Sequence, residues 1–177
     1  VAKAVAVRPS GKILVAGSCY GTAQPCVAQL NANGTLDSSF DGSAGGNGKV
    51  VYPTFGGSGA INDLRFVLLQ PDGHAVLGGT SGSGFAARIT PTGTLDTTFG
   101  GTTGGAAYPP GSVQLPVNAG SGAIQPDGKL VLASVGNLVA RLHSDGTADQ
   151  SFDGPPPHQR RRRGGARLCG RWFPCDS

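Results

Sequence analysis

The sequence contains three copies of one segment, and this repetition constrains the fold more than any other feature. The first part of each copy is a turn followed by an apolar run: VRPSGKILVAG at 7–17, LQPDGHAVLGG at 69–79 and IQPDGKLVLAS at 124–134. The second part ends in a phenylalanine: VAQLNANGTLDSSFDG at 27–42, AARITPTGTLDTTFGG at 86–101 and VARLHSDGTADQSFDG at 139–154. We therefore expect three similar units of about 53 to 62 residues that stack on one another.

Each unit is predicted to form about four short antiparallel strands. The first turn of the units contains Pro9, Gly11, Pro71, Asp72, Gly73, Pro126, Asp127 and Gly128. Proline fixes φ, Asp bonds its own backbone and Gly accepts positive φ, so these segments are tight turns between two strands. We expect an all-β fold of antiparallel four-stranded repeats, arranged as blades of a partial, open β-propeller with an irregular C-terminal tail.

The third copy departs from the pattern, because NAGSGAIQ at 118–125 replaces the more apolar NDLRFVLLQ at 62–70. We expect a weakened or missing strand there. Propeller closure typically takes about four to eight blades, so we expect further copies before Val1 and, in another reading frame, after Gly154. Open strand edges at both ends would then favour oligomerisation or aggregation.

Two domains are expected: residues 1–154 as the three-repeat propeller fragment, and residues 155–177 as a basic tail. The charge of +4 divides into −1 for the first part and +5 for the tail. The four consecutive Arg, 160–163, fit an arm for nucleic acid or anionic lipid. A disordered end and an out-of-frame read of GC-rich DNA are the preferred alternatives, because the tail begins abruptly. We expect it to pack little against the repeats.

Apolar side chains that recur once per unit are expected to pack between neighbouring units rather than to bind a ligand. They are Leu36, Phe40, Leu95, Phe99 and Phe152, with the smaller Ala148 in the third copy.

Acidic residues gather at the turns that close the units: Asp37, Asp41, Asp96, Asp149 and Asp153. Several carboxylates would suit calcium, whereas Asp also stabilises turns by itself. We favour the structural role and expect no cofactor, with calcium as the alternative, because EF-hand and nonapeptide spacings are absent. His74 takes the place of Lys12 and Lys129 in the other copies, and we expect it to be a solvated turn residue.

Catalytic and nucleotide-binding motifs are absent from the sequence. It contains no G-x-S-x-G elbow, and its glycine-rich stretches lack the lysine and context of a phosphate-binding loop. Cys19 and Cys26 frame a long loop in the first unit. Their spacing exceeds that of a zinc pair, so a disulfide formed in an oxidising compartment is the favoured interpretation over a metal site.

The succession of QPDGK, a strand, AR followed by an apolar residue, and DGTLD-x-SF-x-G resembles the delta-60 repeat family of bacterial proteins, over about residues 4–154. The resemblance implies β-propeller modules of the cell envelope or the extracellular space. It brings no catalytic residues, since the family motif is structural.

These observations favour a non-catalytic structural or interaction module of a larger secreted or cell-surface bacterial protein, which presents loops 17–26 and 101–112 from a rigid scaffold. Expected partners are further propeller repeats, of the same parent protein or another chain, and an unknown protein or glycan. Two alternatives stay open: a propeller hydrolase or lactonase with a metal in its central channel, and nucleic-acid binding through the arginine tail. No run approaches the roughly 18 apolar residues of a membrane helix.

Overall fold

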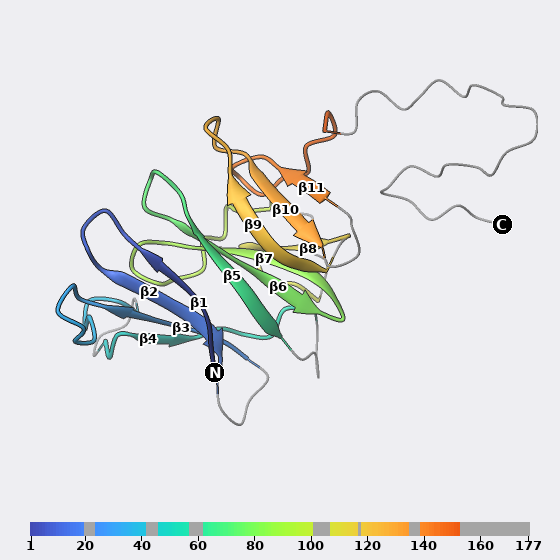
Figure 1. The fold of residues 1–177 in the computed structure, drawn as a ribbon. Coiled ribbons are helices and arrows are strands. Elements are labelled where there is room, and N and C mark those ends of the chain that lie inside the picture. The colour runs from blue at the N-terminus through green and yellow to red at the C-terminus, as the bar shows by residue number, and fades with distance from the viewer. Residues whose placement is uncertain are drawn as a thin grey trace, which may run out of the picture.

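The structure is a computed structural model that describes residues 1–19, 24–41, 46–56, 62–100, 107–116, 118–134 and 139–152. These residues form three antiparallel sheets (Figure 1). The first sheet holds β1 (Ala2–Val7), β2 (Ile13–Ser18), β3 (Pro25–Leu30) and β4 (Lys49–Val51). The second holds β5 (Asp63–Leu69), β6 (Ala75–Ser81), β7 (Ser83–Ile89) and β8 (Ser112–Leu115), and the third holds β9 (Ala119–Ile124), β10 (Leu130–Ser134) and β11 (Val139–Leu142).

Each strand pairs with the next strand along the chain, so every sheet is a simple meander. The three sheets lie in series in Figure 1, with the second between the first and the third. The all-β prediction, with propeller-like blades that do not form a closed barrel within the described residues, is confirmed.

The turn between the first two strands of each sheet has one geometry in all three units. In the first unit the N–H of Gly11 donates to the carbonyl of Arg8 at 2.9 Å, and Gly11 has φ of +80°. Gly73 and Gly128 make the equivalent hydrogen bonds, with φ of +89° and +83°. A residue at positive φ after a tight turn suits a short β-hairpin, which is why glycine stands at this position.

Neighbouring sheets meet through their faces, because successive side chains of a strand point to opposite sides. Leu14, Ala16 and Val27 of the first sheet share one buried cluster with Ala75, Leu77 and Ala87 of the second. Val76 and Ala86, on the other face of the second sheet, share another cluster with Leu130, Leu132 and Ala140 of the third. The core is therefore divided into two layers, one between each pair of sheets.

The weakly apolar segment forms strand β9, so the strand is not missing, but it is less buried than the equivalent strand β5. It pairs with β10 from Ile124 opposite Leu130 to Ala119 opposite Ser134. A Cβ on Gly122 would lie 3.1 Å from Leu68 Cδ1. The larger side chains of the second sheet thus fill the space that a larger residue in β9 would occupy. Within the described residues the third sheet has three strands.

The described part of the chain contains no helix of the length and apolarity that a membrane crossing requires.

Candidate functional site

The closing turn of the first unit is built around the buried carboxylate of Asp37. Its Oδ1 accepts hydrogen bonds from the backbone N and the Oγ of Ser39, at 3.1 and 2.7 Å. Its Oδ2 accepts from Lys12 Nζ and from Gln29 Nε2, both at 2.7 Å. These bonds, with that of Lys12 first, hold the pKa of Asp37 well below its usual value because they favour the charged form. The carboxylate therefore ties the closing turn to β3 and to the first turn of its unit.

Asp149 makes the same arrangement in the third unit. Its Oδ1 accepts from the backbone N and the Oγ of Ser151, and its Oδ2 lies 2.8 Å from Arg141 Nε and 3.1 Å from Lys129 Nζ. The hydrogen bond from Ser151 is the main reason why the pKa of Asp149 is lowered. The guanidinium of Arg141 also lies over the ring of Phe152, 4.6 Å from its centroid.

In the second unit, Asp96 accepts from Thr98 through Oδ1 and from Arg88 Nε through Oδ2, at 2.7 Å. Burial raises the pKa of Asp96, but the hydrogen bonds from Thr98 and the charge of Arg88 outweigh it, so the pKa is lowered. His74 Nε2 lies 3.5 Å from Asp96 Oδ2 and its Nδ1 lies 3.2 Å from Asp72 Oδ2. His74 is therefore half-buried beside the closing carboxylate, and the expectation of a solvated side chain is wrong.

At two positions of the repeat, the first unit has Arg and Gln in the reverse order of the other two units. Gln29 stands where the later units have Arg88 and Arg141, and Arg8 stands where they have Gln70 and Gln125. The two exchanged side chains meet, because Arg8 Nε donates to Gln29 Oε1 at 2.6 Å. Sequence reasoning missed this pair, although aligning VRPSG with LQPDG, and VAQL with AARI, shows both substitutions.

Hydrogen bonds also connect each of the first two units to the unit that follows it. Arg8 Nη1 donates to the carbonyl of Gly73, and Tyr52 Oη donates to that of Gly93, each at 2.5 Å. Between the second and third units, Gln70 Nε2 and Arg88 Nη1 both donate to the carbonyl of Ser144, at 3.0 and 2.9 Å. The polar residues of the repeat therefore join units as well as turns.

The apolar residues that were predicted to pack between units lie as follows. Phe40 and Phe99 are fully buried, and their rings lie against Gly93 and Gly146, in the turns 90–93 and 143–146 that precede the closing turns of the next units. Leu95 is half-buried against the core between the first two sheets. Leu36, in the first unit, is 43 % exposed. Phe152, in the third unit, is half-buried.

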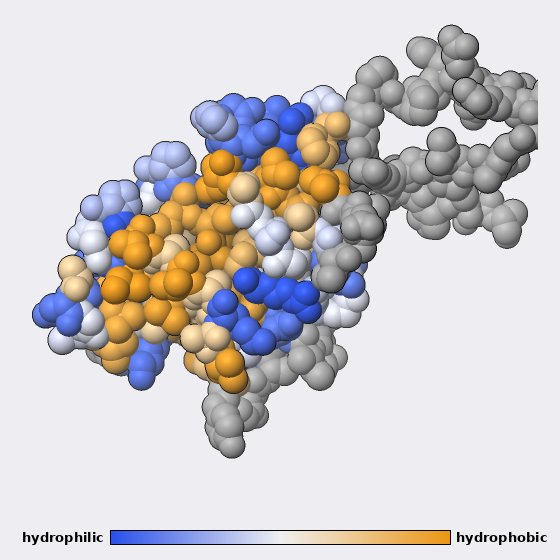
Figure 2. Space-filling model, viewed as in Figure 1, coloured by the Kyte–Doolittle hydropathy of each residue, from blue (hydrophilic) through white to orange (hydrophobic). Residues whose placement is uncertain are grey.

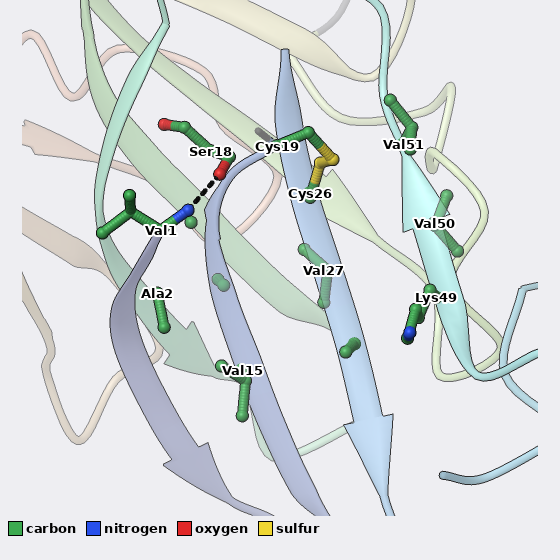
Figure 3. A pocket seen from close by; sticks show the side chains of 13 residues that line it. Val1, Ala2, Val15, Ser18, Cys19, Cys26, Val27, Lys49, Val50 and Val51 are labelled. Atoms are coloured by element: carbon green, nitrogen blue, oxygen red, sulfur yellow. Dashed lines mark hydrogen bonds between the residues drawn. A yellow bond between two sulfur atoms is a disulfide. The ribbon is translucent and has the colours of Figure 1, made fainter. Parts of the chain in front are cut away.

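The long loop of the first unit is joined by a disulfide between Cys19 and Cys26, with their Cα atoms 5.6 Å apart. The bond lies beside a shallow, mostly apolar hollow of about 250 Å³, which Val15, Val27 and Val51 help to line (Figure 3). The amino group of Val1 donates to the carbonyl of Ser18 at the same end of the sheet. The tip of this loop lies outside the described residues.

Metal-binding groups of three or more His, Cys, Asp or Glu side chains do not occur among the described residues. Asp37, Asp96 and Asp149 bond instead to hydroxyl, amide and cationic groups of their own units. The backbone N of Asn47 donates to Asp41 Oδ2. Asp153 and the tail at 155–177 lie outside the described residues.

A protein-family model described as "Domain of unknown function (DUF5122) beta-propeller" matches residues 8–40, 70–99 and 125–152, just over half of the chain. The chain belongs to this family. The three matched segments of the DUF5122 propeller each run from the first turn of a unit to its closing phenylalanine. The family signature is therefore the set of turns and networks described above.

Two solved structures are similar to the DUF5122 propeller chain. Virginiamycin B lyase from Staphylococcus aureus gives a TM-score of 0.53 at 15 % identity, covering 84 % of this chain and 40 % of its own. A protein of unknown function from Bacteroides caccae gives 0.50 at 16 % identity, covering 80 % of this chain and 42 % of its own. At these identities the likeness concerns the fold alone, and this chain spans about two fifths of each structure. No curated protein matches the chain.

Proposed function

We propose that this DUF5122 propeller chain is a non-catalytic interaction module of the delta-60 repeat class, within a larger secreted or cell-surface bacterial protein. The observation that carries the proposal is the use of the charged side chains of the repeat. Asp37 is held by Lys12 and Gln29, and Asp149 by Arg141 and Lys129. Side chains engaged in this way support a rigid frame, which is what an interaction scaffold needs.

The disulfide between Cys19 and Cys26 supports the proposed location, because such bonds form and persist in oxidising compartments. It also fixes the two ends of loop 17–26, the first of the two segments proposed to contact a ligand. The second segment, 101–112, leads into β8 at Ser112. Connections carried by a rigid scaffold are common places for binding residues.

The ligand class that we propose is a protein or a glycan of the bacterial surface. The test is binding of the purified chain to a glycan array and to a set of purified envelope proteins. Two variants accompany it, one with residues 20–23 and one with residues 102–106 replaced by Gly-Ser sequence of equal length. Thr97→Ser, in an exposed turn of the second unit, is the control.

Loss of a ligand in one loop variant, with an unchanged melting temperature, is the expected result. Binding that survives both replacements would contradict loop presentation. Turnover of lactone or ester substrates by the wild-type chain, in the presence or absence of divalent metals, would contradict the non-catalytic assignment.

A further inference from the structure

The buried guanidinium of Arg8 has no acidic partner among the residues that the structure describes. Arg8 is 8 % exposed. The other three arginines of the described ranges, Arg65, Arg88 and Arg141, each form an ion pair with an aspartate. A buried charge is costly unless a group of opposite charge lies beside it. Burial accordingly lowers the pKa of Arg8, because desolvation penalises the charged form. An anion bound beside Arg8 would offset this penalty.

The hydrogen bonds of Arg8 leave one of its nitrogens unused. Nε donates to Gln29 Oε1 and Nη1 donates to the carbonyl of Gly73, and both acceptors are neutral. Nη2 is buried and has no hydrogen-bond partner within the described part of the chain. An unpaired buried donor costs free energy, and more so when it is charged. The guanidinium is therefore fixed in place by two bonds, with a third group of donors still without an acceptor.

Arg8 lines a hollow of about 410 Å³ between the first and second units, here called the seam site. Lys12 and Ser10 also line it from the first unit, and Gly73 and Pro91 line it from the second. The first turns of the units lie along one edge of the molecule in Figure 1, and Figure 2 shows hydrophilic residues along this edge. Both walls of the seam site belong to units of this chain, so further repeats are not needed to form it.

The first turn of the first unit lacks the acidic residue of the other first turns. Ser10 stands where the later units have Asp72 and Asp127. Asp127 Oδ2 lies 3.7 Å from Lys129 Nζ, and Asp72 Oδ2 lies 3.2 Å from His74 Nδ1. The later units thus place a carboxylate beside the cationic side chain of the same turn. In the first unit this position has a hydroxyl group instead.

The charges that surround the seam site leave one positive charge unmatched. Lys12 is paired with Asp37, with Nζ 2.7 Å from Oδ2, whereas Arg8 is unpaired within the described ranges. A single surplus charge matches a carboxylate, which carries one negative charge. A phosphate monoester carries about 1.5 to 2 negative charges at pH 7 and matches it less well. The planar fork of an arginine also suits a planar carboxylate.

We propose that the seam site binds the carboxylate of an acidic ligand, which accepts a hydrogen bond from Arg8 Nη2. The carboxylate comes from a sugar acid or from an acidic amino acid. The site lies at the end of β2 that the first turn precedes, and loop 17–26 follows the other end. Binding here does not involve the loops of the proposed function, so each proposal can fail without the other.

The test is a titration of the isotope-labelled full chain, followed by the NMR signals of its backbone amides. The probes are sodium glucuronate as the sugar acid and acetyl-aspartyl-amide as the acidic amino acid, with glucose as a neutral control and inorganic phosphate as a second anion. At least one of the two acids is expected to cause saturable shifts at Ser10 and Gly73, and the response to each shows which source fits. Glucose is expected to cause none, and phosphate is expected to bind more weakly.

Three variants locate the effect. Arg8→Gln has the residue type of the later units and is expected to bind about tenfold or more weakly, the usual effect of losing a hydrogen bond to a charged group. Ser10→Asp places a carboxylate beside Lys12 and cancels the surplus charge, so it is expected to abolish saturable binding. Thr97→Asp makes the same change of charge at an exposed position that does not line the seam site, and it is expected to bind as the wild-type chain does.

Four results would overturn the proposal: no saturable shifts with either acid, equal shifts with glucose, tighter binding of phosphate than of both acids, or unchanged binding in Ser10→Asp. Melting curves verify that the variants are folded. Ser10→Asp is expected to fold because the later units have aspartate at this exposed turn position. It therefore decides the outcome if Arg8→Gln does not fold.

Discussion

The ring of Phe40 lies against Gly93 of the next unit so closely that a Cβ on this glycine would come to 3.0 Å from the phenylalanine Cζ. Phe99 and Gly146 repeat the relationship, with 2.7 Å to the nearest ring carbons. Both glycines also have positive φ, +96° and +86°. Glycine is therefore required here for two reasons, one conformational and one steric.

The first prediction separates these two reasons. Gly34 has φ of +84°, and no atom of the described residues lies within 4 Å of a Cβ position on it. Gly34→Ala is expected to lower the free energy of unfolding by about 1–3 kcal/mol, because it meets only the positive-φ penalty. Gly93→Ala meets this penalty and the ring of Phe40, so its loss is expected to be larger by about 1–3 kcal/mol, the usual cost of overpacking. Urea denaturation of both variants measures the difference. Equal losses would show that the ring moves aside at no cost.

The exchanged pair in the first unit gives a second prediction. Arg8→Gln removes the donor to Gln29, and Gln29→Arg places a second guanidinium beside Arg8, so each single variant is expected to be destabilised. The double variant has the residue types of the other two units. Its loss of unfolding free energy is expected to be smaller than the sum of the two single losses by about 0.5–3 kcal/mol, the coupling energy usual for residues in contact.

A double-mutant cycle from chemical denaturation gives that coupling energy. The mixed double variant Arg8→Gln with Asp127→Asn, which joins two residues of different units, is the control and is expected to be additive. A coupling near zero in the Arg8 and Gln29 cycle would mean that the exchange is incidental.

The turns and strands of this fold were predictable from sequence because they depend on local residue types. Pro71, Asp72 and Gly73 specify their turn by themselves, and the short apolar runs identify the strands on each side. The same reasoning did not establish that β9 forms, because Gly122 has no side chain of its own and the apolar contacts at this position come from other residues, such as Leu68. Packing between sheets depends on the residues of two segments, so the sequence of one segment is not enough to predict it.

The candidate site was predictable in part for the same reason. The closing aspartates, such as Asp96, were recognised as turn residues because Asp followed by Ser or Thr bonds its own backbone. Their partners across the unit were not, since His74 and Arg88 come from two other strands or turns. The place of His74 in the repeat, equivalent to Lys12, was visible in the alignment and would have indicated a side chain directed at that carboxylate.

The lowered pKa values of Asp37, Asp96 and Asp149 predict how stability depends on pH. A depressed pKa in the folded state contributes stability above the unfolded value of about 3.9, and this contribution is lost as the pH falls through the folded values. The carboxylates are thus expected to keep unfolding free energy level from pH 7 to about pH 5 and to lower it progressively below about pH 4.

Thermal melts from pH 7 to pH 2 measure this dependence. Asp37→Asn is expected to be less stable at pH 7 and to lose less stability on acidification. Asp127→Asn is the control, because Asp127 is exposed and an amide oxygen can also accept the hydrogen bond from the backbone N of Lys129. A wild-type chain with the same acid profile as Asp37→Asn would exclude this carboxylate as a source of the dependence.

The last prediction concerns the disulfide that joins the ends of loop 17–26. Closing so short a loop is expected to contribute about 2–3 kcal/mol by restricting the unfolded chain, so the double variant Cys19→Ser and Cys26→Ser should unfold at lower urea. The variant Cys169→Ser and Cys175→Ser, in the tail, is the control and should match the wild-type chain. Chymotrypsin cleaves after Tyr20, between the two cysteines, so peptides that separate only after reduction identify the bond by mass spectrometry. Peptides that separate without reductant would show that Cys19 and Cys26 are not joined.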